Sequence, residues 1–148
     1  MEKESTSALL HVLQNLKRED LGRYEREHLP SEGTSFVTYM DGLIAQKRLK
    51  RQDIFQKADI PQKYGYKLLS GESHTTDRDK LLRICIAMNL TLKQTQRALT
   101  LYGMPVLYPK LRRDAVFIIA LNRGISSVDT VNQWLSEQGE AELSRSSG

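Results

Sequence analysis

Four long polar side chains lie close together between Pro61 and Gly71, and each of them can donate a hydrogen bond. They are Gln62, Lys63, Tyr66 and Lys67. If this stretch is a helix, all four share one face, because residues three and four apart are neighbours on a helix surface. The apolar residues Leu68 and Leu69, with Tyr64, would then lie on the inner face. Donors on an exposed helix face can reach base edges in the major groove of DNA.

A second short helix is predicted directly before this one. Ile54, Phe55 and Ala58 recur at helical spacing and form an apolar stripe. Asp59 and Ile60 follow, and Pro61 suits the first position of a helix because its φ is fixed and no N–H donor is needed there. The stretch from 51 to 71 is therefore predicted to be two short helices joined by a tight turn.

The other periodic stretches also predict helices, and none predicts a strand. The run 115–121 is rich in β-branched residues, but its Asn-Arg-Gly ending and its helical neighbours favour a buried helix. Capping patterns mark the predicted starts, at Thr34 or Ser35, Thr76, Thr91 and Ser126. We therefore expect an all-α protein with helices over about 6–20, 35–46, 51–58, 61–69, 77–88, 91–102, 109–122 and 126–138.

Breaks between these helices suggest four parts. The segment 27–33 contains a proline, a serine and a glycine, and it separates an N-terminal amphipathic arm, 1–33, from the body. We expect the body over 34–104, a two-helix extension over 105–139 and a disordered polar tail over 140–148. The extension can complete the core, form a homodimer or bind a protein partner.

Positive charge is concentrated in the middle of the chain. The whole protein has a net charge of +4, but residues 35–123 hold 16 Lys and Arg against 7 Asp and Glu, a net +9. The basic run 46–51, which includes Lys50 and Arg51, can favour a helix C-terminus, bind phosphate, or do both. Lys110, Arg112 and Arg113 form a further basic cluster at a predicted helix start, where cations oppose the helix dipole.

Enzymatic and metal chemistry find little support in the sequence. His11, His28 and His74 lie in the arm, the linker and a turn, away from other ligands at metal-binding spacing. Cys85 is the only cysteine and lies among apolar residues, so we expect an unreactive core thiol and no disulfide. No apolar run is long enough to cross a membrane and no signal peptide is evident, so we expect a cytoplasmic protein without cofactors or metal.

The body resembles the five-helix DNA-binding domain of the lambda-repressor-like, or XRE, helix-turn-helix family. The resemblance covers about 35–103 and rests on the helix pair closed by Leu68-Leu69-Ser70-Gly71, the polar turn after it, and the run from Arg78 to Leu92. It implies a lambda-repressor-like domain with an additional N-terminal helix and a two-helix C-terminal extension.

The resemblance also implies roles for individual residues. Gln62, Lys63, Tyr66 and Lys67 would contact bases, with Gln suited to adenine and Lys to guanine. The phosphate contacts would come from Lys50, Arg51, Tyr64, Ser73, His74, Thr75, Thr76 and Arg78. The cluster Lys110, Arg112 and Arg113 would add basic surface.

Three positions depart from the family pattern, which has a small Ala at Phe55, a Gly at Asp59 and a β-branched residue at Gly65. We expect Phe55 and Gly65 to face each other, so that a large residue on one side meets a small one on the other. Asp59 can adopt the left-handed conformation that the turn requires more readily than most residues can.

Together these features predict a DNA-binding transcriptional regulator, a repressor-type dimer that reads a palindromic operator with the helix Pro61–Leu69. The alternative is a protein-interaction module or antitoxin-like adaptor that keeps the fold but binds a protein partner through the arm or the extension.

Overall fold

A computed structural model describes residues 32–145 of the protein, with side chains from Phe36 onward. This part of the chain forms seven helices and no strand, so the predicted all-α class is confirmed for it. The arm helix predicted over 6–20 lies outside the described residues. The helices are α3 Glu32–Gln46, α4 Arg51–Ala58, α5 Gln62–Ser70, α6 Arg78–Ala87, α7 Leu92–Tyr102, α8 Arg112–Asn122 and α9 Val128–Glu137.

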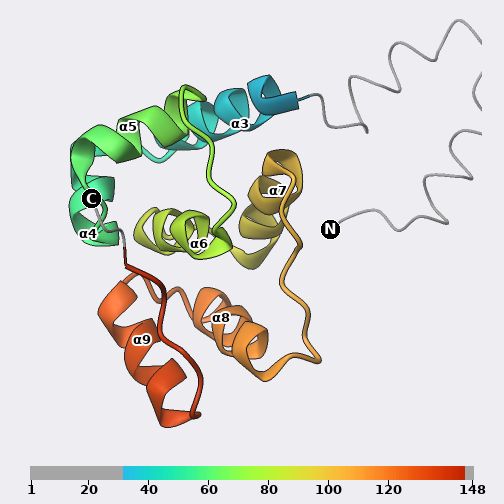
Figure 1. Ribbon diagram of the computed structural model, residues 1–148. Coiled ribbons are helices and arrows are strands. Elements are labelled where there is room, and N and C mark those ends of the chain that lie inside the picture. Colours follow the sequence, from blue (N-terminus) through green and yellow to red (C-terminus); the bar gives the residue numbers. More distant parts are fainter. Residues whose placement is uncertain (1–31, 146–148) are drawn as a thin grey trace, which may run out of the picture.

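The helices are arranged around α6, which lies at the centre of the molecule (Figure 1). α3 and α5 lie at one end, α8 and α9 at the other, and α4 covers one side. α3 packs on α7, α4 packs on α6, and α9 packs on α8 and α6. A single apolar core runs from Phe36 to Leu143, so the extension shares the core of the body.

α6 is central because almost all of its surface is buried. Every residue from Lys80 to Met88 is buried, as expected for a helix that is apolar on all sides. The exceptions to its apolar character are Lys80 at its start and Arg83 in its middle, which are 8% and 2% exposed. A buried arginine needs hydrogen-bond partners, and its partners are described below.

Two of the predicted helix caps are one residue off. α6 is capped by Asp77, which accepts a hydrogen bond from Asp79 N–H, and not by Thr76. α9 is capped by Ser127 and not by Ser126. α3 begins at Glu32, before both predicted caps. The capping box of Thr91 with Gln94 is confirmed.

α8 is a helix, as expected, but it begins at Arg112 and not at residue 109. Two reciprocal ion pairs join its start to the start of α6. Arg78 on α6 pairs with the buried Asp114 on α8 at 2.6 Å. Arg113 on α8 pairs with Asp79 on α6 at 2.9 Å. Both carboxylates lie in the first turns of their helices, where the helix dipole favours negative charge.

The predicted disorder of the tail is wrong for residues 140–145. This segment runs back along the molecule from the end of α9 to the side of α4 (Figure 1). Leu143 is 3% exposed within the core, and Ser144 is hydrogen-bonded to Asp77 and Asp79. One buried leucine and a set of polar contacts therefore order a segment whose composition is mostly polar.

No helix between residues 32 and 145 combines the length and apolar character that crossing a lipid bilayer requires.

Candidate nucleic-acid interface

The turn between α4 and α5 has the conformation expected from the sequence. Asp59 ends α4 in the left-handed region, with φ 57° and ψ 50°, and its N–H bonds back to Gln56 O. The next residue, Ile60, is buried and donates its N–H to Phe55 O. Pro61 precedes α5 as its N-cap residue, whereas the sequence predicted it as the first helical residue.

α5 has a buried face and an exposed face. Gly65, Leu68 and Leu69 pack inward. The predicted base-contacting residues lie together on the other side, where Gln62, Lys63 and Tyr66 are exposed and Lys67 is partly exposed. The spacing of these residues therefore gives the shared outward face that the sequence predicted.

Tyr66 is held on this face by an aromatic contact. Its ring meets that of Phe55 edge to face, with centroids 5.0 Å apart and an interplanar angle of 72°. Such pairs contribute about 0.5–1.5 kcal/mol beyond their buried area. Phe55 is 1% exposed, so the core of the helix pair fixes the position of an exposed ring.

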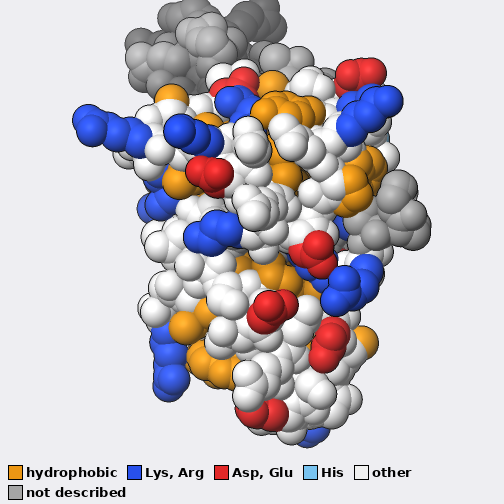
Figure 2. Space-filling model, turned by 90° about the vertical axis from the view of Figure 1, so that its left-hand side faces the viewer, with side chains coloured by type: hydrophobic (Ala, Val, Ile, Leu, Met, Phe, Trp, Pro, Cys, Tyr) orange, Lys and Arg blue, Asp and Glu red, His pale blue; other side chains and the backbone are white. Residues whose placement is uncertain are grey.

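Cations are frequent on α4, on α5 and in the loop before α4. Figure 2 views the side of the molecule that carries α4, and its Lys and Arg side chains gather mainly over the upper part, where α3 to α5 lie. The helix pair and the loop before it supply Lys47, Arg48, Lys50, Lys57, Lys63 and Lys67. Arg51 is half-buried and pairs with Asp41 of α3, so part of its charge is neutralised.

The turn after α5 is tied to α7 through Tyr102. Thr75 N–H donates to the Tyr102 hydroxyl at 2.8 Å, and the exposed His74 ring stacks on the Tyr102 ring with centroids 4.5 Å apart. Burial raises the pKa of Tyr102 above its ordinary value of 10.0, although the Thr75 N–H opposes the shift. The neutral hydroxyl thus anchors a turn that carries four predicted phosphate contacts.

Those four residues and Tyr64 differ in exposure. His74 and Thr76 are exposed, whereas Ser73, Thr75 and Tyr64 are half-buried. The Thr75 hydroxyl also accepts a hydrogen bond from Asp77 N–H. The exposed pair is therefore better presented to a ligand than the other three.

Two arginines predicted at the interface are used inside the molecule. Arg78 bonds to Asp114 and to the carbonyls of Pro105 and Val106. Arg113 bonds to Asp79 and to the carbonyl of Ala141. Their guanidinium groups hold α6, α8 and the tail together, so we no longer assign either to phosphate binding.

Lys110 and Arg112 remain exposed at the start of α8. Arg112 lines a groove of about 380 Å³ between α8 and α9, together with Ile119, Arg123 and Trp134. This groove belongs to the extension, at the opposite end of the molecule from α5 (Figure 1).

Sequence reasoning missed Arg83, which connects the tail to the helix pair. Its Nη1 donates to the carbonyl of Ala58, the last residue of α4, at 2.9 Å, and its Nε donates to Ser144 O at 2.8 Å. Burial lowers the pKa of Arg83, while the carboxylate of Asp59 opposes that effect. A cation inside the run Leu81-Leu82-Arg83-Ile84 was the available signal.

Among the side chains from Phe36 to Arg145, no group of His, Cys, Asp and Glu is arranged as metal ligands would be. Cys85 is 1% exposed, and burial raises the pKa of its thiol to about 12. It is thus the buried core thiol that the sequence predicted.

Comparison of the chain with protein-family models, with curated proteins and with solved structures found no match in any of the three.

Proposed function

We propose that the protein is a sequence-specific DNA-binding regulator of the lambda-repressor-like type that inserts α5 into the major groove. The observation that carries this proposal is the outward face of α5, where Gln62, Lys63 and Tyr66 are exposed side by side on a helix fixed by a buried inner face. Amide and ammonium donors on such a face match the acceptors of adenine and guanine.

The surroundings of α5 support the same function. Cations on α4 and in the loop before it would meet the phosphates on either side of the groove and add sequence-independent affinity. α5 is a helix of nine residues, and its N-terminal half holds two of the four predicted base contacts. We expect a homodimer on a palindromic site, with transcription blocked sterically.

A salt titration with matched variants tests this function. Binding to duplex DNA should weaken steeply as salt rises, because each phosphate contact releases a counterion. Lys63→Ala combined with Lys67→Ala should abolish sequence preference. The control is Lys93→Ala combined with Arg97→Ala, which removes two exposed cations at the same spacing on α7 and should leave the preference intact. An equal loss of sequence preference in the two double variants would contradict the role of α5.

A protein-interaction module is the second candidate, and a specific observation favours it. Leu111, which lies just before α8, is 54% exposed, and Ile119, which lies within α8, is 50% exposed. Ile119 also lines the groove between α8 and α9. Exposed apolar side chains beside a groove are typical of protein contacts. Binding through this groove should respond little to salt, in contrast to DNA binding.

A further inference from the structure

The tail residues Leu143 and Ser144 are held in the way that a binding site holds an extended peptide. All four of their backbone polar groups bond to side chains of helices. Leu143 N–H donates to Asn132 Oδ1 at 2.8 Å, and Ser144 N–H donates to Asp79 Oδ2 at 2.9 Å. Their two carbonyls accept from Arg83, at 3.2 Å and 2.8 Å.

Side chains of the tail complete the fit. Leu143 is 3% exposed in the core. The Ser144 hydroxyl donates to Asp77 Oδ2 at 2.5 Å, and Lys80 Nζ donates to the carbonyl of Arg145 at 2.8 Å. We call the surroundings of the tail the groove, which α6 forms with Asp79, Lys80 and Arg83 and α9 with Asn132. Its donors and acceptors alternate along the tail, and it has an apolar socket for Leu143.

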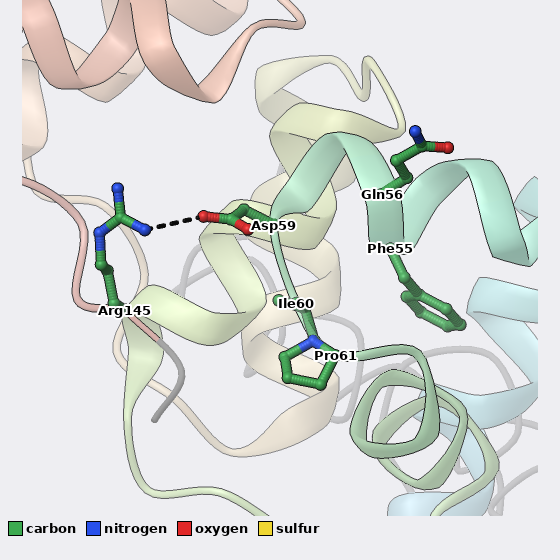
Figure 3. A pocket seen from close by; sticks show the side chains of 6 residues that line it. All are labelled: Phe55, Gln56, Asp59, Ile60, Pro61 and Arg145. Atoms are coloured by element: carbon green, nitrogen blue, oxygen red, sulfur yellow. Dashed lines mark hydrogen bonds and ion pairs between the residues drawn. The ribbon is translucent and has the colours of Figure 1, made fainter. Parts of the chain in front are cut away.

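The groove and the tail segment in it each contact the candidate DNA-binding helix pair once. Arg83 bonds to Ala58 O, one of the terminal carbonyls of α4 that have no partner within the helix. Arg145 reaches Asp59, the left-handed residue that ends α4, at 3.1 Å. Figure 3 shows Arg145 beside Asp59, with Ile60 and Pro61 leading from there into α5.

The buried contact of Arg83 with Ala58 stabilises the turn more than the exposed contact of Arg145 with Asp59 does. Arg145 and Asp59 have side chains that are 81% and 64% exposed, and exposed pairs contribute little because water screens them. Arg83 is buried, and its three charge-assisted hydrogen bonds fix one guanidinium between the tail and the end of α4. Loss of the tail removes two of these bonds and opens the guanidinium to water.

We propose that the groove formed by α6 and α9 is a peptide-binding site for an extended Leu-Ser-Arg segment, occupied by the chain's own residues 143–145, and that Arg83 is a positioning residue that couples this occupancy to the α4–α5 turn. Docking of the segment orders the turn and presents α5. The effect on DNA rests on the proposed function, whereas docking and the order of the turn do not.

The test uses the full chain with Leu143→Asp, which places a charge in the apolar core where Leu143 is buried. The matched control is Ala141→Asp, the same substitution at an exposed position two residues earlier. Hydrogen exchange is measured at the amides of Asp59 and Ile60, which close the end of α4, and at Leu99 in α7. A peptide with the sequence of residues 140–148 is then added in trans.

Leu143→Asp should speed exchange at Asp59 and Ile60 but not at Leu99, and the peptide should restore slow exchange. Ala141→Asp should change none of the three amides. Equal acceleration at all three amides would show a general loss of stability and overturn the proposal, as would unchanged exchange at the turn or failure of the peptide to restore it.

DNA affinity gives the second readout. Leu143→Asp should weaken binding by about tenfold, a usual size for coupling between two sites. Unchanged affinity despite a loosened turn would overturn the coupling to α5. Absence of DNA binding by the unmodified chain would instead contradict the proposed function. Hydrogen exchange alone would then show whether the groove binds the peptide and orders the turn.

Discussion

Gly65 and Phe55 are complementary in size across the α4–α5 pair. A Cβ atom added to Gly65 would lie 2.5 Å from Cδ1 of the Phe55 ring, closer than atoms can pack. The ring is 1% exposed and packs edge to face against Tyr66, so an added side chain at Gly65 would have to displace a ring held by its neighbours. The large residue on α4 therefore requires the absence of a side chain on α5, as the sequence predicted.

Substitutions at these two positions should be strongly coupled. Phe55→Ala should lower the free energy of unfolding by about 3–5 kcal/mol because it leaves a cavity. Gly65→Ala should cost about 1–3 kcal/mol through overpacking. Phe55→Ala combined with Gly65→Ile should recover much of the first loss, since the new side chain fills the space.

Urea unfolding measures these changes, and Gly42→Ala is the control. Gly42 lies within α3 with no atom within 4 Å of an added Cβ, so alanine there should stabilise the helix by about 1 kcal/mol. Simple additivity of the Phe55 and Gly65 effects would contradict a direct contact.

Asp114 should be the most costly carboxylate to remove. It is 2% exposed and accepts hydrogen bonds from Arg78 and from Tyr108 N–H. Asp114→Ala should cost about 3–5 kcal/mol because it strands a partly buried guanidinium. Arg145→Ala, which breaks an exposed pair, should cost less than about 1 kcal/mol. Thermal melting of the two variants measures both changes.

A double variant shows whether the cost of Asp114→Ala comes from the unpaired charge of Arg78. Arg78→Met combined with Asp114→Leu should be more stable than Asp114→Ala alone, because no unpaired charge remains. If the double variant is the less stable of the two, the cost of Asp114→Ala does not come from a stranded charge.

The Cys85 thiol should resist alkylation in the folded protein. Its pKa is raised to about 12 and its side chain is buried, so at pH 8 almost no thiolate is present or accessible. Iodoacetamide should react with it only after unfolding in urea, as mass spectrometry would show. Rapid modification under native conditions would mean that α6 opens readily.

Asp77 should make stability depend on acid pH. Burial alone would raise its pKa, but hydrogen bonds from Ser144 and Asp79 N–H, with the nearby Lys80 ammonium, lower it below 3.8. Between the lowered pKa of the folded state and the unfolded value of 3.8, the unfolded state binds more protons than the folded state. The stabilisation by the Asp77 carboxylate is therefore present above pH 3.8 and is lost as pH falls through the pKa of the folded state.

Comparison with Asp77→Asn isolates that contribution. The difference in unfolding free energy between the natural protein and this variant should be constant near neutral pH and should shrink below pH 3.8. A difference that grows on acidification would contradict the lowered pKa.

The helices of the described region could be predicted from the sequence because apolar periodicity and capping residues are local signals. The capping box at Thr91 and the left-handed residue Asp59 are examples, since neighbouring residues decide both. The polar face of α5 followed from spacing alone. A local pattern thus placed the predicted base-contacting residues together.

The long-range contacts could not be predicted in this way. Arg78 and Arg113 are cations at helix starts, and only the fold shows that buried or partly buried carboxylates on facing helices take their charges. Leu143 was the only apolar residue in its segment after Ala141, so nothing nearby indicated that it enters the core. Pairings between segments distant in sequence depend on topology, and composition does not encode them.

Selection of bound DNA from a random pool at moderate salt tests the central claim most directly. The account predicts that the natural protein enriches a short palindromic motif, that Lys93→Ala with Arg97→Ala enriches the same motif, and that Lys63→Ala with Lys67→Ala enriches none. Recovery of no motif by the natural protein would contradict DNA readout by α5 and favour the interaction module.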